Sequence, residues 1–142
     1  MSAIATVKAV LEDTPYLVSF TDDLGHTWSA DEPTEVGGGN AAPSPERLIL
    51  SGLGACTAIV LNTYAHNHGI PLRGVTVDTS FARVFADDCE DCEIDDTYEE
   101  VINEKVDFEG DLDESQLRRL HRVAKACSIR RLLENGIRVI SD

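Results

Sequence analysis

The sequence has few basic residues. Lysine and arginine number 12 against 26 aspartates and glutamates, which leaves a net charge of −14 over 142 residues. Such a chain has little positive surface with which to release the counterions of a phosphate backbone, so nucleic acid is not an expected partner. The acidic balance is equally typical of a salt-adapted surface and of an ordinary acidic cytosolic protein.

Long hydrophobic runs are also missing. Charged or polar residues interrupt every apolar stretch before it reaches the roughly 18 residues that a membrane-spanning helix needs. Residues 1–11 contain one lysine and no long apolar core, so they do not resemble a signal peptide. We therefore expect a cytoplasmic protein without membrane contact. The length predicts a single domain over residues 1–142.

The chain contains only four cysteines, and they are unevenly placed. In a reducing compartment, cysteines are more often catalytic, metal-binding or simply buried than joined in structural disulfides. Cys56 and Cys127 lie in apolar helical patterns, whereas Cys89 and Cys92 lie in an acidic stretch. The two pairs therefore call for separate interpretations.

The hydrophobic pattern predicts an α+β chain, because strands and helices do not alternate as βαβ units. A capping-box signature at Asp113 and Gln116 marks one helix start, and Asn135 with Gly136 marks a helix end. The expected elements are, in order, strands over 4–11, 16–21 and 26–30, a helix over 45–68, strands over 75–85 and 99–108, two helices between 113 and 135, and a strand over 137–140.

The helix expected over residues 45–68 is apolar nearly all the way round from Leu48 to Ala65. Such a helix is expected to be buried on most faces, inside a sheet or between two subunits. Gly52 and Gly54 each cost roughly 1 kcal/mol relative to alanine in a helix interior, which predicts a break there. A restart after Gly54 would place Cys56 in a first helical turn, where the dipole favours a thiolate.

Several short motifs, taken in their order and spacing, resemble the OsmC/Ohr family of osmotically inducible and organic-hydroperoxide-resistance proteins. The resemblance covers roughly residues 25 to 140 and includes the run LGACTA around Cys56. The acidic stretch DCEDC, residues 88–92, resembles a loop of one OsmC-like branch. The segments that carry the resemblance are 30–33, 37–38, 43–46, 53–58, 64–65, 71–72, 75–77, 110–113 and 124–133.

The resemblance implies an intertwined homodimer whose long central helices are buried under curved sheets. It also implies reduction of organic hydroperoxides by a reactive and a resolving cysteine, with no bound cofactor. The reductant would be an external dithiol of the dihydrolipoyl type, free or on a lipoylated protein. By position, Cys56 matches the reactive cysteine, Cys127 the resolving cysteine and Glu46 the active-site carboxylate.

The chain departs from this pattern in two places. Peroxidase members carry an arginine in the first strands, whereas residues 1–46 here contain none. The family's usual Cys-Pro-Val-His reads Cys-Ser-Ile-Arg from Cys127 to Arg130. Arg47, Arg130 and Arg131 are the candidates to replace the missing cation.

The residues alone leave other interpretations open. Cys56 and Cys127 are also explained as small apolar packing residues, and Glu46 as a first-turn acid that complements a helix dipole. The Cys89 and Cys92 pair has a spacing suited to zinc, with neighbouring carboxylates or a second copy as further ligands, or to a redox pair. The rival functions are a non-catalytic protein that binds lipophilic ligands and a metal- or redox-sensing module.

Overall fold

The computed structural model describes residues 3–85 and 98–142. Cys89 and Cys92, predicted as a metal or redox pair, therefore lie outside the described residues. The chain forms two compact units, residues 1–49 and 50–142, which are treated one at a time below. Helix α1 (Pro45–Asn67) belongs to both units.

The first unit is built on a small antiparallel sheet. Its strand order is β1-β2-β3, with Val7 opposite Asp22 and Thr21 opposite Thr27. The rings of Phe20 and Trp28 stack across two neighbouring strands at 5.4 Å. The three expected strands are thus confirmed, with a later start for the first. Their bounds, with the short helix that follows, are β1 (Val7–Leu11), β2 (Val18–Asp22), β3 (Thr27–Ala30) and η1 (Thr34–Val36).

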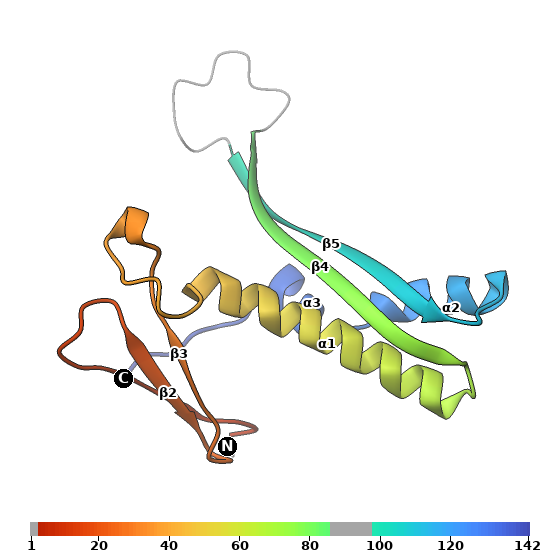
Figure 1. Cartoon of the computed structure of the whole chain (residues 1–142), viewed down its shortest axis with the longest axis horizontal. Coiled ribbons are helices and arrows are strands. Elements are labelled where there is room, and N and C mark those ends of the chain that lie inside the picture. Colours follow the sequence, from red (N-terminus) through yellow and green to blue (C-terminus); the bar gives the residue numbers. More distant parts are fainter. Residues whose placement is uncertain (1–2, 86–97) are drawn as a thin grey trace. The chain divides into compact units, whose positions relative to one another are not determined.

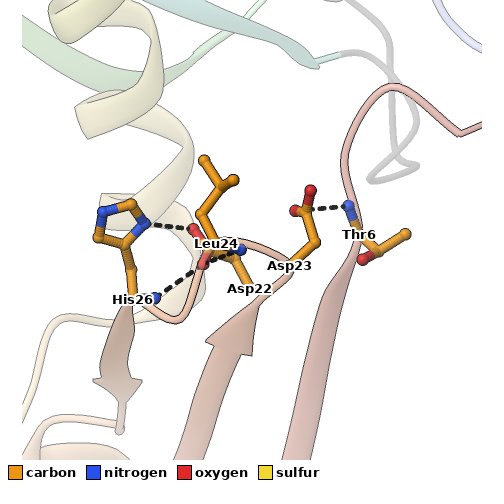
Figure 2. A network of polar contacts seen from close by, with 5 residues as sticks. All are labelled: Thr6, Asp22, Asp23, Leu24 and His26. Atoms are coloured by element: carbon orange, nitrogen blue, oxygen red, sulfur yellow. Dashed lines mark hydrogen bonds and ion pairs between the residues drawn. The ribbon is translucent and has the colours of Figure 1, made fainter.

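The turn between β2 and β3 is held by Asp22, as Figure 2 shows. Its carboxylate accepts hydrogen bonds from the backbone N–H of Leu24 at 2.9 Å and of His26 at 2.8 Å, and contacts His26 Nδ1 at 2.7 Å. Burial alone would raise the pKa of Asp22, but these hydrogen bonds hold that pKa below its usual value. Asp23 accepts from the Thr6 N–H at 3.2 Å, so both aspartates serve the turn.

A second carboxylate, that of Asp31, organises the loop that leads to α1. Asp31 is only 3% exposed, and it accepts from the backbone N–H groups of Glu32, Ala41 and Gly39 at 2.8, 3.0 and 3.4 Å. Gly38 lies directly against the Glu32 carbonyl, where any Cβ would collide with the backbone. The buried Asp31 carboxylate therefore holds the backbone of this loop together, just before α1 begins.

Replacing Asp31 with asparagine is expected to loosen this loop and lower the Tm by several degrees. The N–H bonds from Ala41 and Glu32 outweigh burial and hold the pKa of Asp31 below 3.8, so its stabilisation is complete above that pH and is lost as pH falls through the lowered value. Thermal melts from pH 6 to pH 2 check this. Asp31→Asn should lose less Tm on acidification than the wild type, and equal losses would contradict the assignment.

The second unit packs helices against one long hairpin (Figure 1). Strand β4 (Leu72–Phe85) pairs antiparallel with β5 (Tyr98–Gly110), with Val77 opposite Val106. Helices α2 (Glu114–Ala124) and α3 (Ser128–Asn135) follow. The α+β class is confirmed. The buried core of this unit consists of Leu61, Ala65, Ile70, Leu120 and Ala124.

Helix α1 is continuous through its two central glycines, so the break expected there is wrong. The hairpin anchors the helix on both sides of Gly54. Thr79 Oγ1 donates to the Leu50 carbonyl at 3.4 Å, and Thr57 Oγ1 donates to Glu104 on β5 at 2.9 Å. These tertiary contacts offset the low helix propensity of the glycines, which is a weak local preference.

Within one chain, the buried residues of α1 form a single stripe along the helix. Leu53, Thr57, Leu61 and Ala65 recur every fourth residue and are buried, whereas Ile59 is 63% exposed. The expectation of burial on most faces is therefore not met by one chain alone. The reason is that the hairpin and α2 cover only one side of the helix.

By length and composition, α1 is also apolar enough to cross a membrane. It has 23 residues, and its mean hydropathy reaches 1.6 over an 18-residue stretch. This criterion averages hydropathy over the helix, whereas the expectation from the sequence concerned uninterrupted apolar runs, which polar residues such as Asn62 still interrupt. One such helix is weak evidence for a membrane, because core helices of soluble proteins meet the same criterion.

The last expected strand, residues 137–140, does not form. Ile137, Val139 and Ile140 are 70%, 83% and 70% exposed. A strand needs a neighbour for its backbone N–H and C=O groups, and no strand of the described residues pairs with this segment. The apolar pattern is present, but within the described part of the chain it has no strand beside it.

Candidate active site

The structure brings together the two cysteines that the sequence pattern singled out. Cys56, in the middle of α1, and Cys127, just before α3, hydrogen-bond through their side chains. Both are free thiols. Cys56 is partly exposed, whereas Cys127 is only 2% exposed. One accessible and one buried sulfur therefore share a single site in the second unit.

The chain places Cys127 by capping two successive helices. Asp113 and Gln116 form the expected capping box, with bonds of 2.8 and 3.0 Å that start α2. Leu120 fixes α2 to the core, and the helix ends at Ala124. Cys127 is then the N-cap of α3, where its sulfur accepts from the backbone N–H of Arg130 at 3.5 Å.

Cys56 faces the N-terminus of α3. Its Sγ lies 3.7 Å from the hydroxyl of Ser128. Burial by itself would raise the pKa of Cys56, but hydrogen bonds from the Cys127 thiol, the Ile129 and Ser128 backbone N–H groups and the Ser128 hydroxyl outweigh it and lower that pKa. The activating helix end was expected within α1. In the structure, the helix end beside Cys56 is that of α3, where the positive end of the dipole also favours an anion.

The pKa of Cys127 shifts the opposite way. Burial raises it, and the hydrogen bond that the thiol gives to Cys56 raises it further, against weaker effects from the Arg130 and Ile129 N–H groups. The two neighbouring thiols therefore differ in protonation. Cys56 ionises first, while Cys127 keeps its proton and donates a hydrogen bond to the Cys56 sulfur. This difference is what a nucleophile and its partner require.

The predicted carboxylate lies elsewhere on α1. Glu46 is exposed in the first turn of that helix, and ten residues of unbroken helix rise about 15 Å, so α1 holds Glu46 away from the Cys56 of its own chain. The replacement cations are engaged or exposed. Arg47 Nη1 donates to Ser44 Oγ at 2.9 Å, Arg130 Nε contacts Glu134 at 2.7 Å, and Arg131 is exposed.

A cleft of about 480 Å³ lies between the hairpin and α3. It includes Leu53, one turn before Cys56, and Arg130, three residues after Cys127. Both apolar and acidic side chains line the cleft. Its residues are Leu53, Ile102 and Leu133 together with Glu99, Glu100, Glu104, Glu134 and Arg130.

Within residues 3–85 and 98–142, no three histidines, cysteines or carboxylates gather in a way that would hold a metal ion. Two of the histidines instead make ring contacts, His68 with Tyr64 at 3.9 Å and His121 with Phe108 at 4.9 Å. The predicted zinc site at Cys89 and Cys92 stays a prediction, because it lies outside the described residues.

The sequence pattern missed Ser128 as a site residue. The departure from the family's Cys-Pro-Val-His was visible in the sequence, but it appeared only as the loss of a familiar motif. Ser128 and Ile129 direct hydrogen-bond donors at Cys56 because α1 and α3 meet in the fold. In the sequence, Cys56 and Ser128 are 72 positions apart. Ile129 acts through its backbone, which a side-chain pattern does not reveal.

Solved structures of other proteins share this fold. An OsmC-like protein from Mycoplasma pneumoniae has a TM-score of 0.72 at 19% identity, over 94% of this chain and 89% of its own. Organic hydroperoxide resistance proteins from Legionella pneumophila and Bacillus subtilis have TM-scores of 0.63 and 0.61, both at 18% identity. The alignments cover 93% and 94% of this chain, and 91% and 93% of theirs. At these identities the likeness shows the fold.

The sequence matches none of the curated proteins. The family model for OsmC-like proteins, in contrast, matches residues 37–142, about three quarters of the chain. That range includes Cys56, Cys127 and every helix and strand of the second unit. The chain therefore belongs to the OsmC-like protein family.

Proposed function

We propose that this protein is a cysteine-dependent reductase of organic hydroperoxides that draws its electrons from an external dithiol. The observation that carries the proposal is the thiol pair: Cys56 has a lowered pKa and a partly exposed sulfur, and the buried Cys127 is its hydrogen-bond neighbour. The OsmC-like family and its organic hydroperoxide resistance members support a role in defence against peroxide stress.

In the first step, the Cys56 thiolate attacks the terminal oxygen of the hydroperoxide. The S–O bond forms as the O–O bond breaks, and the departing alkoxide takes up a proton, which leaves a sulfenic acid and an alcohol. Cys127 then attacks the sulfenic sulfur, and a disulfide forms with loss of water. An external dithiol, such as a dihydrolipoyl group, reduces this disulfide by exchange and becomes a disulfide itself.

The order of the two thiols follows from their environments. The sulfur that is ionised at lower pH and reaches solvent is the better first nucleophile, which is Cys56. The buried Cys127 is protected from peroxide and already lies beside the sulfur that it must attack. Organic peroxides are favoured over hydrogen peroxide, since an alkyl tail gains about 25 cal/mol per Å² of apolar surface removed from water.

A turnover assay tests the proposal directly. The purified, reduced protein is mixed with cumene hydroperoxide or hydrogen peroxide, and peroxide loss is followed with dihydrolipoamide, dithiothreitol or glutathione as reductant. We expect catalytic turnover with the two dithiols and faster loss of the organic peroxide. Absence of turnover with all three reductants would refute the reductase, and would favour the rival protein that binds lipophilic ligands without catalysis.

We also propose that the protein is a homodimer in the cytoplasm. A groove of about 300 Å³ lies between α1 and the start of β4, and it includes Ile59, which is 63% exposed. The segment 137–140 is apolar and unpaired by the described strands. A second copy would bury these surfaces. The same partner would have to supply Glu46, if that carboxylate acts at the thiols.

Replacing Ile59 with glutamate is expected to weaken the dimer, because it places a charge in the apolar surface that the second copy would cover. Light scattering at low micromolar concentration should give twice the chain mass for the wild type and a lower mass for Ile59→Glu. Ser115→Glu adds the same charge at an exposed site on α2 and serves as the control. A monomeric wild type would refute the dimer.

A further inference from the structure

Ser128 stands where the family pattern has proline, immediately after the second cysteine. A proline has neither a hydroxyl group nor a backbone N–H to donate. Serine at this position therefore adds two hydrogen-bond donors to the site. Both reach the same atom, since the hydroxyl lies 3.7 Å from Cys56 Sγ and the Ser128 N–H is also bonded to that sulfur.

The backbone at Ser128 makes these donors available. Cys127 is the N-cap of α3, so Ser128 occupies the first helical position, where the N–H has no partner inside the helix. Its bond to Cys56 therefore competes with no helical hydrogen bond. Once Cys56 has lost its proton, its sulfur is only an acceptor, and the Ser128 hydroxyl is the donor across the 3.7 Å contact.

We propose that Ser128 stabilises the Cys56 thiolate with its hydroxyl and its backbone N–H, in place of the arginine that residues 1–46 lack. Ser128 touches the reacting sulfur and is thus a catalytic residue. Naming peroxide as the electrophile rests on the proposed function, but stabilisation of the thiolate does not. The Arg130 guanidinium bonds through its Nε to Glu134 at 2.7 Å.

Three substitutions separate the two donors. Ser128→Thr keeps both, Ser128→Ala removes the hydroxyl alone, and Ser128→Pro removes the hydroxyl and the N–H. The proline variant suits the backbone, because proline is favoured at the first position of a helix. It also requires an extended residue before it, and Cys127 already has φ −67° and ψ 131°. Far-UV circular dichroism checks that each variant folds.

The readout is the rate at which iodoacetamide alkylates Cys56 as a function of pH, followed on the Cys56 peptide by mass spectrometry. This separates Cys56 from the other three cysteines of the chain. Loss of a hydrogen bond to a charged group should slow alkylation near neutral pH by about tenfold in Ser128→Ala. Ser128→Pro should be slower still, and Ser128→Thr, which keeps both donors, should be the least affected of the three.

The midpoint of each profile is the pH at which Cys56 is alkylated at half its maximum rate. Midpoints in Ser128→Ala and Ser128→Pro equal to that of the wild type would overturn the proposal. Midpoints that rise in the order Thr, Ala, Pro support it. Peroxide turnover, measured on the same proteins, tests the reductase separately. A wild type without turnover would refute that function, while the alkylation profiles would still decide the role of Ser128.

Discussion

Replacing Cys56 with serine is expected to lower peroxide turnover by at least about a thousandfold, because a serine hydroxyl is not ionised near neutral pH and is a weak nucleophile. Replacing Cys127 with serine should also stop turnover, but at a later step. Its Cys56 still reacts once with peroxide, and it is then trapped as a sulfenic acid or as a mixed disulfide with the reductant, because no second thiol lies beside it. Stopped-flow peroxide consumption measures the first step in both variants.

The choice of replacement at Cys127 tests the geometry of the pair. The variant Cys127→Ser keeps a hydrogen-bond donor for Cys56, whereas Cys127→Ala removes it. The Cys127 thiol is among the donors that lower the pKa of Cys56, so that pKa should rise in Cys127→Ala. The first oxidation near neutral pH should then be slower in Cys127→Ala than in Cys127→Ser.

Two results would contradict this division of roles. Turnover that survives in Cys56→Ser would show that another cysteine reacts with peroxide. Equal loss of the first oxidation in Cys56→Ser and Cys127→Ser would mean that the two thiols act as one unit and not in sequence. Mass spectrometry after dimedone treatment locates the sulfenic acid, which we expect on Cys56.

Replacing Leu120 with alanine is expected to destabilise the protein by about 2–5 kcal/mol, the usual range for a buried leucine that leaves a cavity. Leu120 is fully buried, and it fixes α2 to the core shared with Leu61 of α1. Because α2 leads directly to the N-cap of α3, loss of this contact should also loosen the Cys127 position. Urea denaturation followed by circular dichroism gives the free energy of unfolding.

Arg118→Ala is the matched control on the same helix. The Arg118 side chain is 69% exposed, and its contact with Glu114 is 3.9 Å long. An exposed ion pair of this kind contributes little, so the control should stay within about 0.5 kcal/mol of the wild type. A Leu120→Ala variant as stable as Arg118→Ala would contradict the core assigned to the second unit.

The sequence was sufficient for much of the local structure. The capping box at Asp113 and Gln116 was predicted and is present, because it depends on residues three positions apart. The end of α3 at Asn135 and Gly136 was likewise predicted from short-range signals. The break at Gly52 and Gly54 was not correct. Helix propensity is a weak preference, and two hydrogen bonds between α1 and the hairpin, from Thr57 to Glu104 and from Thr79 to Leu50, overrode it.

The resemblance in the sequence identified Cys56 and Cys127 as a pair, but it did not show how one thiol is activated. A missing arginine is visible as an absence in residues 1–46, whereas its replacement by Ser128 depends on where α3 begins in space. Backbone donors such as the Ile129 N–H have no side-chain signature. Their effect follows from the direction of a helix end.

Sequence patterns were enough to assign the family, the α+β class and the pair of candidate cysteines, because motif order and hydrophobic period are properties of the chain alone. Which helix end lies beside Cys56 depended on the tertiary contacts. The tertiary structure also decided that α1 remains unbroken and that residues 137–140 stay unpaired by the described strands. These outcomes depend on contacts between residues far apart in the chain. Hydrogen bonds and burial at such contacts exceed the local preferences that a sequence pattern expresses.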